Sequence, residues 1–354
     1  MKKKLIFLSD FPFSEPGLEE KIAAESSLVA DVKRGQCEKP EEVLDQAPDV
    51  QALLVHHTPV TAGLIKSLPQ LEVIGRYGAG YDVVDVMAAT EAGIPVINDP
   101  VYCREEVSSQ VLSYILALSR GLIPLHNMVT NGGWQREEDF RAAGPLRRLA
   151  GRKLGIIGMG NVGFRLAEKA AALNLEVYFY NRRAEEKMAE IRRRKEGKAK
   201  ADAFAGDSIE SLEDIKPLAL DELLQRSDFI SLHLPLTPQT EAFIGKRELS
   251  LMNEEAFLIN TARGKIVQEK ALVEALKNEE IAGAALDVFW QEPLPEDHPL
   301  LELDESRVIL TPHSAFYSEE AEKELRESIM EQALTALAGE RPRHTVNPEV
   351  FGED

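Results

Sequence analysis

The feature that most constrains the fold is a glycine-rich turn, LGIIGMGNVG, which joins an apolar strand to a helix. The pattern predicts the strand over 154–158 and the helix over 161–173. A strand, a tight glycine turn and a helix in this order are typical of doubly wound α/β domains with a parallel sheet. Further apolar runs separated by helical patterns predict the other strands of this domain, at 177–180, 229–232, 257–260, 284–288 and 308–311.

The glycines of this turn have separate tasks in such domains. Gly158 permits the tight turn, Gly160 lets the backbone approach a pyrophosphate, and Gly163 lets the helix pack closely on the strand. Asn161 and Val162 are the first residues of the helix. Its N-terminus offers free N–H groups and a partial positive charge to phosphates. These residues are therefore predicted to bind a dinucleotide, although three glycines alone also occur in unrelated strand–helix turns.

The first hundred residues alternate short apolar runs with helical stretches, which predicts a second parallel sheet with crossover helices. The predicted strands are 5–8, 52–55, 73–75 and 95–97, and the predicted helices are 18–30, 40–46, 61–67 and 84–92. The apolar pattern over 105–122 predicts a helix that is buried over much of its circumference. A last helix, over 318–338, is expected to return to the first domain, which would then consist of both chain ends.

A charged, alanine-rich insert near 184–217 is long for a connection in a compact domain, and no strand is evident in it. The simpler interpretation is a solvated surface excursion, since runs of charge are usually solvated. The alternative is that its basic residues, RRRK at 192–195, lie over the adenosine end of the cofactor.

Composition excludes several classes of partner. The net charge of −19 argues against nucleic acid or an anionic membrane surface, because both attract basic faces. No stretch approaches the roughly 20 apolar residues of a membrane span. The only cysteines are Cys37 and Cys103, which give no disulfide framework or zinc pattern and suit a reducing compartment. We expect a cytoplasmic protein that binds no metal, no nucleic acid and no membrane.

The residues after the strand EVYFY bear on the choice between NAD and NADP. An acidic side chain about twenty residues after the glycine turn usually holds the adenosine ribose hydroxyls in NAD enzymes. Here the positions hold Asn181, Arg182 and Arg183. Asparagine does not repel a phosphate, and two guanidinium groups could grip a 2′-phosphate in bidentate fashion. The sequence therefore favours NADP over NAD; the alternative is that both arginines face water.

Three polar residues at predicted strand ends suit the reduction of a 2-keto acid. Arg263, in NTARG, offers a planar, always charged guanidinium to hold the carboxylate and polarise the carbonyl. His313, in TPHSA, suits proton transfer near neutral pH. Glu292, in DVFWQEP, could fix the tautomer of the imidazole and favour its protonated form. Each residue alone is more often structural, but their combination in a nucleotide-binding chain favours catalysis.

At this point the chain resembles the D-isomer-specific 2-hydroxyacid dehydrogenases over nearly its full length. The resemblance is carried by GRYGAGYDVVD, the glycine turn, SLHLPLT, NTARG, GAALDVFWQEP and TPHSA. It implies two doubly wound α/β domains with a cleft between them: a flavodoxin-like substrate domain of residues 1–104 and 314–354, and a Rossmann domain of residues 105–313. It also implies a dimer built across the nucleotide-binding domains.

The resemblance also implies site residues. Arg263, Glu292 and His313 would be the catalytic set, and Arg263 and His313 would contact the substrate. Backbone amides near Tyr77, Gly78 and Ala79 would hold the substrate carboxylate. Beyond the glycine turn and the segment after EVYFY, the expected cofactor contacts are His233, Pro235, Thr240, Thr261, Ala262 and Asp287. Of these, Asp287 could accept a hydrogen bond from the nicotinamide amide, and His233 could simply pack near the adenine.

Within the family, VHHTPVT, YCREEVSSQVL and TPHSAFYSEEA are similar to the C-terminal binding protein branch of dinucleotide-binding corepressors. At the ribose-binding position, the pattern of Asn181 followed by two arginines is instead similar to that of glyoxylate and hydroxypyruvate reductases. The expected function is NAD(P)-dependent interconversion of a small 2-keto acid, of glyoxylate, hydroxypyruvate or pyruvate size, and its D-2-hydroxy acid. The alternative is a dinucleotide-sensing interaction protein. Specificity is expected from loops around 56–59 and 77–79, and from Phe316.

Overall fold

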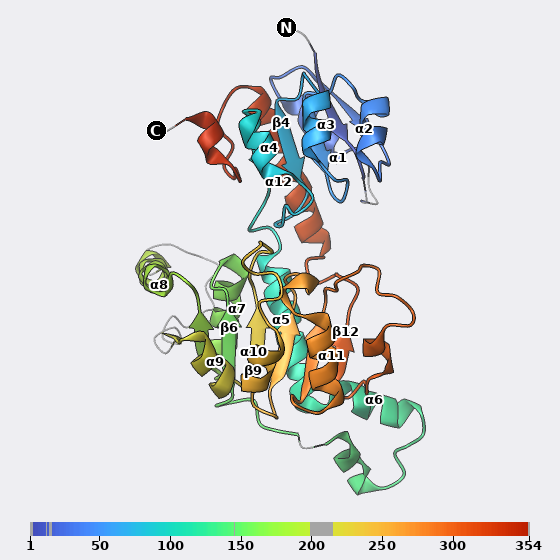
Figure 1. Ribbon diagram of the computed structural model, residues 1–354, viewed down its shortest axis with the longest axis vertical. Coiled ribbons are helices and arrows are strands. Elements are labelled where there is room, and N and C mark those ends of the chain that lie inside the picture. Colours follow the sequence, from blue (N-terminus) through green and yellow to red (C-terminus); the bar gives the residue numbers. More distant parts are fainter. Residues whose placement is uncertain (1–2, 12, 14–15, 145, 199–214, 353–354) are drawn as a thin grey trace. The chain divides into compact units, whose positions relative to one another are not determined.

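The computed structural model describes residues 3–11, 13, 16–144, 146–198 and 215–352. The chain divides into two compact units (Figure 1). Unit 1 consists of Met1–Cys103 and Tyr317–Asp354, and unit 2 consists of Arg104–Phe316. Both units contain a parallel sheet with crossover helices, so the predicted α/β class is confirmed.

Unit 1 contains a five-stranded sheet in the order β2-β1-β3-β4-β5, which is the flavodoxin-like order. Its strands are β1 Lys4–Leu8, β2 Ala30–Arg34, β3 Ala52–Val55, β4 Val73–Arg76 and β5 Val96–Ile97. Its helices are α1 Leu18–Glu25, α2 Pro40–Gln46, α3 Ala62–Ser67, α4 Val86–Glu91 and α12 Glu319–Leu337, with the short helix η5 Pro348–Phe351. Helix α12 packs on α1 and on β4, so both chain ends build this unit.

The predicted helix over 18–30 was wrong in its second half. Helix α1 ends at Glu25, because the backbone of Ser26 turns to an extended conformation. The chain then forms β2, which pairs only with β1. An edge strand with alternately exposed residues carries a weak apolar signal, and ADVKR is such a strand.

Unit 2 contains a seven-stranded parallel sheet in the order β12-β11-β10-β9-β6-β7-β8, a Rossmann order with an added strand. Its strands are β6 Lys153–Ile157, β7 Glu176–Tyr180, β8 Lys216–Pro217, β9 Phe229–Leu232, β10 Phe257–Asn260, β11 Gly283–Leu286 and β12 Val308–Leu310. Its α-helices are α5 Arg104–Arg120, α6 Leu122–Thr130, α7 Asn161–Ala172, α8 Ala184–Lys198, α9 Leu220–Arg226, α10 Lys246–Leu251 and α11 Glu269–Lys277. Short 3₁₀ helices are η1 Glu137–Ala143, η3 Gly264–Ile266 and η4 Pro299–Glu302.

Two expectations for unit 2 need correction. The charged insert ends in a strand that the sequence did not reveal, because β8 has only two residues and pairs at the sheet edge with β7. The insert begins as helix α8, and residues 199–214 lie outside the described part of the chain. The helix expected over 105–122 continues differently: Gly121 adopts a left-handed conformation, and α6 follows it.

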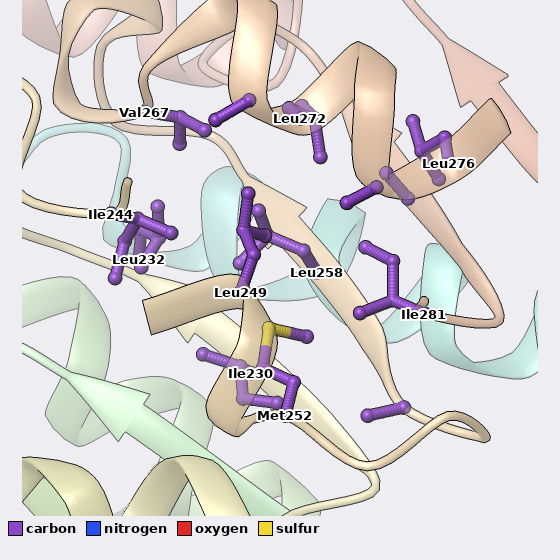
Figure 2. Packing of buried hydrophobic residues seen from close by; sticks show 14 of the residues in the cluster. Ile230, Leu232, Ile244, Leu249, Met252, Leu258, Val267, Leu272, Leu276 and Ile281 are labelled. Atoms are coloured by element: carbon purple, nitrogen blue, oxygen red, sulfur yellow. The ribbon is translucent and has the colours of Figure 1, made fainter. Parts of the chain in front are cut away.

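Apolar clusters cover both faces of the seven-stranded sheet. Neighbouring residues of β6 point to opposite faces, so that Ile157 joins the cluster under α9, α10 and α11, and Ile156 joins the cluster under α5 and α7. Figure 2 shows the first cluster, in which Leu249 of α10 and Leu272 of α11 pack against Leu258 of β10. Over the part of the chain that the structure describes, no helix is both long and apolar enough to cross a membrane.

Candidate active site

The glycine turn has two crowded positions and one open position. A Cβ atom on Gly158, whose φ is +104°, would lie 2.4 Å from the carbonyl oxygen of His233. A Cβ atom on Gly163 would lie 2.3 Å from the carbonyl oxygen of Gly158. At Gly160, the N-cap of α7, a Cβ atom would meet nothing within 4 Å. The first and third glycines are therefore required by packing, whereas the second faces open space, as a pyrophosphate site requires.

The end of β7 lies beside this turn. The N–H of Gly158 donates to the carbonyl of Tyr180 over 3.0 Å, which brings the following residue, Asn181, next to the first glycine. The side-chain oxygen of Asn181 accepts the N–H of Arg183 at 2.9 Å. The side chains of Arg182 and Arg183 are exposed, and Arg183 Nη1 lies 3.5 Å from the Glu186 carboxylate.

The loop after β9 carries three expected cofactor contacts. His233 Nε2 lies 2.9 Å from the Ser231 hydroxyl, and burial lowers the pKa of His233 to about 4, so the imidazole is neutral at pH 7. The Thr240 hydroxyl donates to the carbonyl of Pro235 at 2.6 Å and accepts the N–H of Thr237 at 2.8 Å. Thr240 therefore fixes the loop from within, and only 6% of it is exposed.

The turn after β10 carries Arg263. Asn260 folds back over it, donating from Nδ2 to the Arg263 carbonyl at 2.9 Å and accepting the N–H of Ala262 at 3.0 Å. The guanidinium donates to the Ala262 carbonyl at 2.7 Å. Thr261 has a buried hydroxyl oxygen without a hydrogen-bond partner among the described residues. An unsatisfied buried hydroxyl calls for a ligand atom, and a dinucleotide between this turn and the glycine turn would supply one.

His313 and Glu292 form a hydrogen-bonded pair. His313 Nδ1 lies 2.7 Å from Glu292 Oε2, and Glu292 Oε1 accepts the N–H of Phe289 at 2.9 Å. Desolvation raises the pKa of Glu292, but the hydrogen bonds from His313 and Phe289 and the charge of Arg263 outweigh it, so its pKa lies below the usual value. Arg263 and His313, from remote parts of the sequence, therefore both act electrostatically on Glu292.

The loop that carries His313 is gathered by Asp287. This carboxylate is 1% exposed. It accepts the N–H groups of Ser314 at 3.0 Å and Ala315 at 2.9 Å, and the hydroxyl of Thr311. The oxygens of Asp287 thus accept hydrogen bonds from the loop that carries His313. This role was not predicted from the sequence, since Asp287 was expected to accept a hydrogen bond from the nicotinamide amide. The Phe316 ring lies edge-on to His313, with 6.1 Å between the centroids.

Unit 1 contains the segment 77–79, whose backbone amides were expected to hold the substrate carboxylate, and one of these amides needs correction. The N–H of Tyr77 donates to the Val55 carbonyl at 2.8 Å, because the pairing of β3 and β4 continues one residue beyond β4. This amide is therefore not available to a substrate. Among the described residues, no hydrogen bond takes up the N–H groups of Gly78 and Ala79. Gly78 has a φ of +138°, which favours glycine.

A neighbouring loop of unit 1 is held by a single carboxylate. Asp10 accepts the N–H groups of His56 at 2.9 Å and Thr58 at 3.1 Å, and also that of His57. The loop around 56–59, which is expected to contribute to substrate specificity, is therefore held at the carboxyl end of β3 through its backbone N–H groups.

Comparison with known proteins places this geometry in a family. A family model described as "D-isomer specific 2-hydroxyacid dehydrogenase, NAD binding domain" matches residues 112–209 and 202–315. The chain belongs to this family. It is 34% identical over 313 residues to a glyoxylate reductase of Korarchaeum cryptofilum, an alignment that covers 87% of this chain and 86% of the relative. It is 37% identical to a D-3-phosphoglycerate dehydrogenase of Methanocaldococcus jannaschii, but spans only 53% of the length of that protein.

Solved structures agree with this assignment. An acyclic imino acid reductase, solved with NADPH and D-arginine, is 27% identical, with a TM-score of 0.78 over 98% of this chain and 100% of the other. The predicted family membership is confirmed, and the chain is an oxidoreductase that acts on CH–OH groups with a nicotinamide cofactor.

Proposed function

We propose that the enzyme interconverts a small 2-keto acid and its D-2-hydroxy acid with NADP as the preferred cofactor. The observation that carries this proposal is the His313–Glu292 pair, 2.7 Å between Nδ1 and Oε2, under the influence of the Arg263 charge. An imidazole with a carboxylate behind it and a guanidinium nearby is what carbonyl reduction requires. The name of the glyoxylate reductase relative supports a substrate with a small side chain.

Arg263 anchors the substrate in this proposal. Its turn is fixed by Asn260 on one side and by the close approach of Gly264 to Phe289 on the other. A planar guanidinium held in this way can bind one carboxylate oxygen and the keto oxygen together, which orients the carbonyl carbon and polarises its bond. We also propose that the N–H groups of Gly78 and Ala79 in unit 1, which no hydrogen bond takes up among the described residues, bind a carboxylate oxygen.

His313 transfers the proton. The hydrogen bond from Nδ1 to Glu292 leaves Nε2 as the ring nitrogen that faces the keto oxygen. During reduction Nε2 donates its proton to that oxygen, and during oxidation it removes the hydroxyl proton. Glu292 fixes the tautomer and stabilises the imidazolium. The nicotinamide cofactor supplies or accepts the hydride.

The cofactor preference rests on the end of β7. Asn181 and two exposed arginines stand where an NAD enzyme usually has a carboxylate. Asn181 already accepts the N–H of Arg183, so its side chain orders the start of the arginine segment. The 2′-phosphate of NADPH would gain charge-assisted hydrogen bonds from Arg182 and Arg183. NADH would find no carboxylate at this position for its ribose hydroxyls.

We further propose a homodimer formed through α5, α6 and η1 of unit 2. Helix α6 is strongly apolar, yet none of its side chains is fully buried. The large apolar side chains exposed along these elements and the connection between α6 and η1 are Leu116, Leu122, Val129, Trp134 and Phe140. An exposed apolar surface of this kind typically marks a protein interface. Sedimentation velocity should give twice the monomer mass, and Leu122→Glu should shift it towards the monomer. Cys37 and Cys103 are both buried and form no disulfide, which supports our proposal of a cytoplasmic location.

A substrate screen tests the proposed function. The screen offers each acid with NADPH and with NADH, and follows consumption of the reduced cofactor at 340 nm. The acids are glyoxylate, hydroxypyruvate, pyruvate and a bulkier control, phenylpyruvate. The proposal predicts turnover of a small acid with a clear preference for NADPH. Tight NADPH binding without turnover of any acid would contradict it and favour a dinucleotide sensor. A preference for NADH would remove the assigned role of the two arginines.

A further inference from the structure

A buried tyrosine lies next to the loop that carries His313. Tyr114, in the middle of α5, is 2% exposed, and its ring packs in the cluster under α5 and α7. Its hydroxyl oxygen lies 2.5 Å from the hydroxyl oxygen of Thr311, at the end of β12. A phenylalanine would fill the same apolar space, so the packing of the ring does not require the hydroxyl.

The direction of these hydrogen bonds follows from the proton count. The Thr311 hydroxyl donates to Asp287 Oδ1, and a hydroxyl has only one proton to donate. Thr311 must therefore accept from Tyr114. Desolvation raises the pKa of Tyr114, against the opposing effect of hydrogen bonds to Thr311 and Gln110, so the phenol keeps its proton and remains a donor.

The hydrogen bonds from Tyr114 through Thr311 to Asp287 reach residues on both sides of His313 in the sequence. Asp287 accepts from the Thr311 side chain before the histidine and from the N–H groups of Ser314 and Ala315 after it. His313 has a φ of +52°, and its own N–H donates to the Thr311 carbonyl at 3.0 Å. A left-handed conformation is unfavourable for a residue with a side chain, so it persists only where its surroundings hold it. Thr311 and Asp287 provide that restraint.

We propose that Tyr114 is a positioning residue for His313. Its hydroxyl fixes the rotamer of Thr311, Thr311 orients Asp287, and Asp287 holds the loop so that the imidazole keeps its hydrogen bond to Glu292. This inference rests on the proposed function, in which His313 transfers the proton. It assigns a role in the reaction to a helix residue that is 197 positions from Thr311.

The test is Tyr114→Phe, with Tyr178→Phe as the control, because the Tyr178 hydroxyl donates to Glu176 within its own strand, β7, at 3.0 Å. Loss of the hydroxyl, and with it the buried hydrogen bond to Thr311, should lower kcat about 3- to 10-fold. The Kd for NADPH should be unchanged. The imidazole ¹H–¹³C resonances of His313, identified by their absence in His313→Ala, should move or broaden. Tyr178→Phe should leave both kcat and these resonances as in the wild type.

A double-variant comparison distinguishes positioning from general destabilisation. If Tyr114 acts through His313, adding Tyr114→Phe to His313→Ala should not lower the residual rate further. An equal loss in both backgrounds, or unchanged kcat and unchanged His313 resonances in Tyr114→Phe, would overturn the inference. If Tyr114→Phe does not fold, Thr311→Val provides the same readouts. A wild-type chain without turnover would remove the proposed function, and the resonances would still decide whether Tyr114 acts on His313.

Discussion

The turn that carries Arg263 fits tightly against the backbone that leads to Glu292, and one added methyl group tests this contact. A Cβ atom on Gly264 would lie 2.0 Å from the carbonyl carbon of Phe289 and 2.1 Å from its oxygen. Carbon atoms in ordinary contact are about 3.5 Å apart, so Gly264→Ala requires a separation of about 1.5 Å between the two segments. No side-chain rotation relieves the overlap, because the contacted atoms belong to the backbone.

Two effects of Gly264→Ala are expected. Overpacking should cost about 1–3 kcal/mol of stability, measured by urea unfolding. Displacement of Arg263 from the His313–Glu292 pair should lower kcat/KM about 100-fold in the folded variant, since a shift of about 1 Å at a reacting group has that effect. Steady-state consumption of NADPH with the preferred keto acid gives the second number.

The control is Gly63→Ala in helix α3, where a Cβ atom would meet only the Thr61 hydroxyl oxygen at 3.7 Å. Its kcat/KM should equal that of the wild type. Its stability should be unchanged or higher by up to about 1 kcal/mol, because alanine favours a helix more than glycine does. A folded Gly264→Ala variant with wild-type kcat/KM would refute the idea that this contact keeps the arginine in place.

Further predictions concern the glycine turn and the loop after β9. Gly160→Ala should keep the wild-type stability but bind NADPH about 10-fold more weakly, a loss of about 1.4 kcal/mol, in a fluorescence titration. Gly163→Ala should instead lose about 1–3 kcal/mol of stability, because its Cβ would lie 2.3 Å from the Gly158 carbonyl oxygen. The pKa of His233 is lowered to about 4, whereas an unfolded imidazole titrates near 6.5. Because the unfolded chain takes up this proton first, stability should fall as the pH drops from about 6.5 towards about 4. His233→Gln should weaken that dependence in urea midpoints measured at pH 7 and pH 5.

Long, buried elements with a regular pattern were predictable from the sequence. The strands of unit 2 that carry the site, such as Phe257–Asn260, are mostly apolar runs between helical segments, and the structure has them within one or two residues. Two of the edge strands, β2 and β8, were not predicted. β2 alternates charged and small residues, and β8 has two residues, so neither has enough buried side chains to produce a pattern.

The same difference holds for the site. Arg263, Glu292 and His313 follow predicted strands, and the carboxyl ends of parallel strands meet at one edge of a sheet, so their proximity was expected from these positions. The hydrogen bonds that hold them were not. The Tyr77 amide is occupied by sheet pairing, and the bond from Tyr114 to Thr311 joins residues that have no local relation in the sequence. Such contacts depend on how helices pack on the sheet, which a single sequence does not encode in any short motif.

The central claim is that His313, supported by Glu292, transfers the proton, and that other residues of unit 2 bind the dinucleotide. The most direct measurement is single-turnover reduction of the preferred keto acid by His313→Ala preloaded with NADPH, together with the Kd of the variant for NADPH. The expected result is a rate lower by about 10²- to 10⁴-fold with an unchanged Kd. A single-turnover rate equal to that of the wild type would contradict the account.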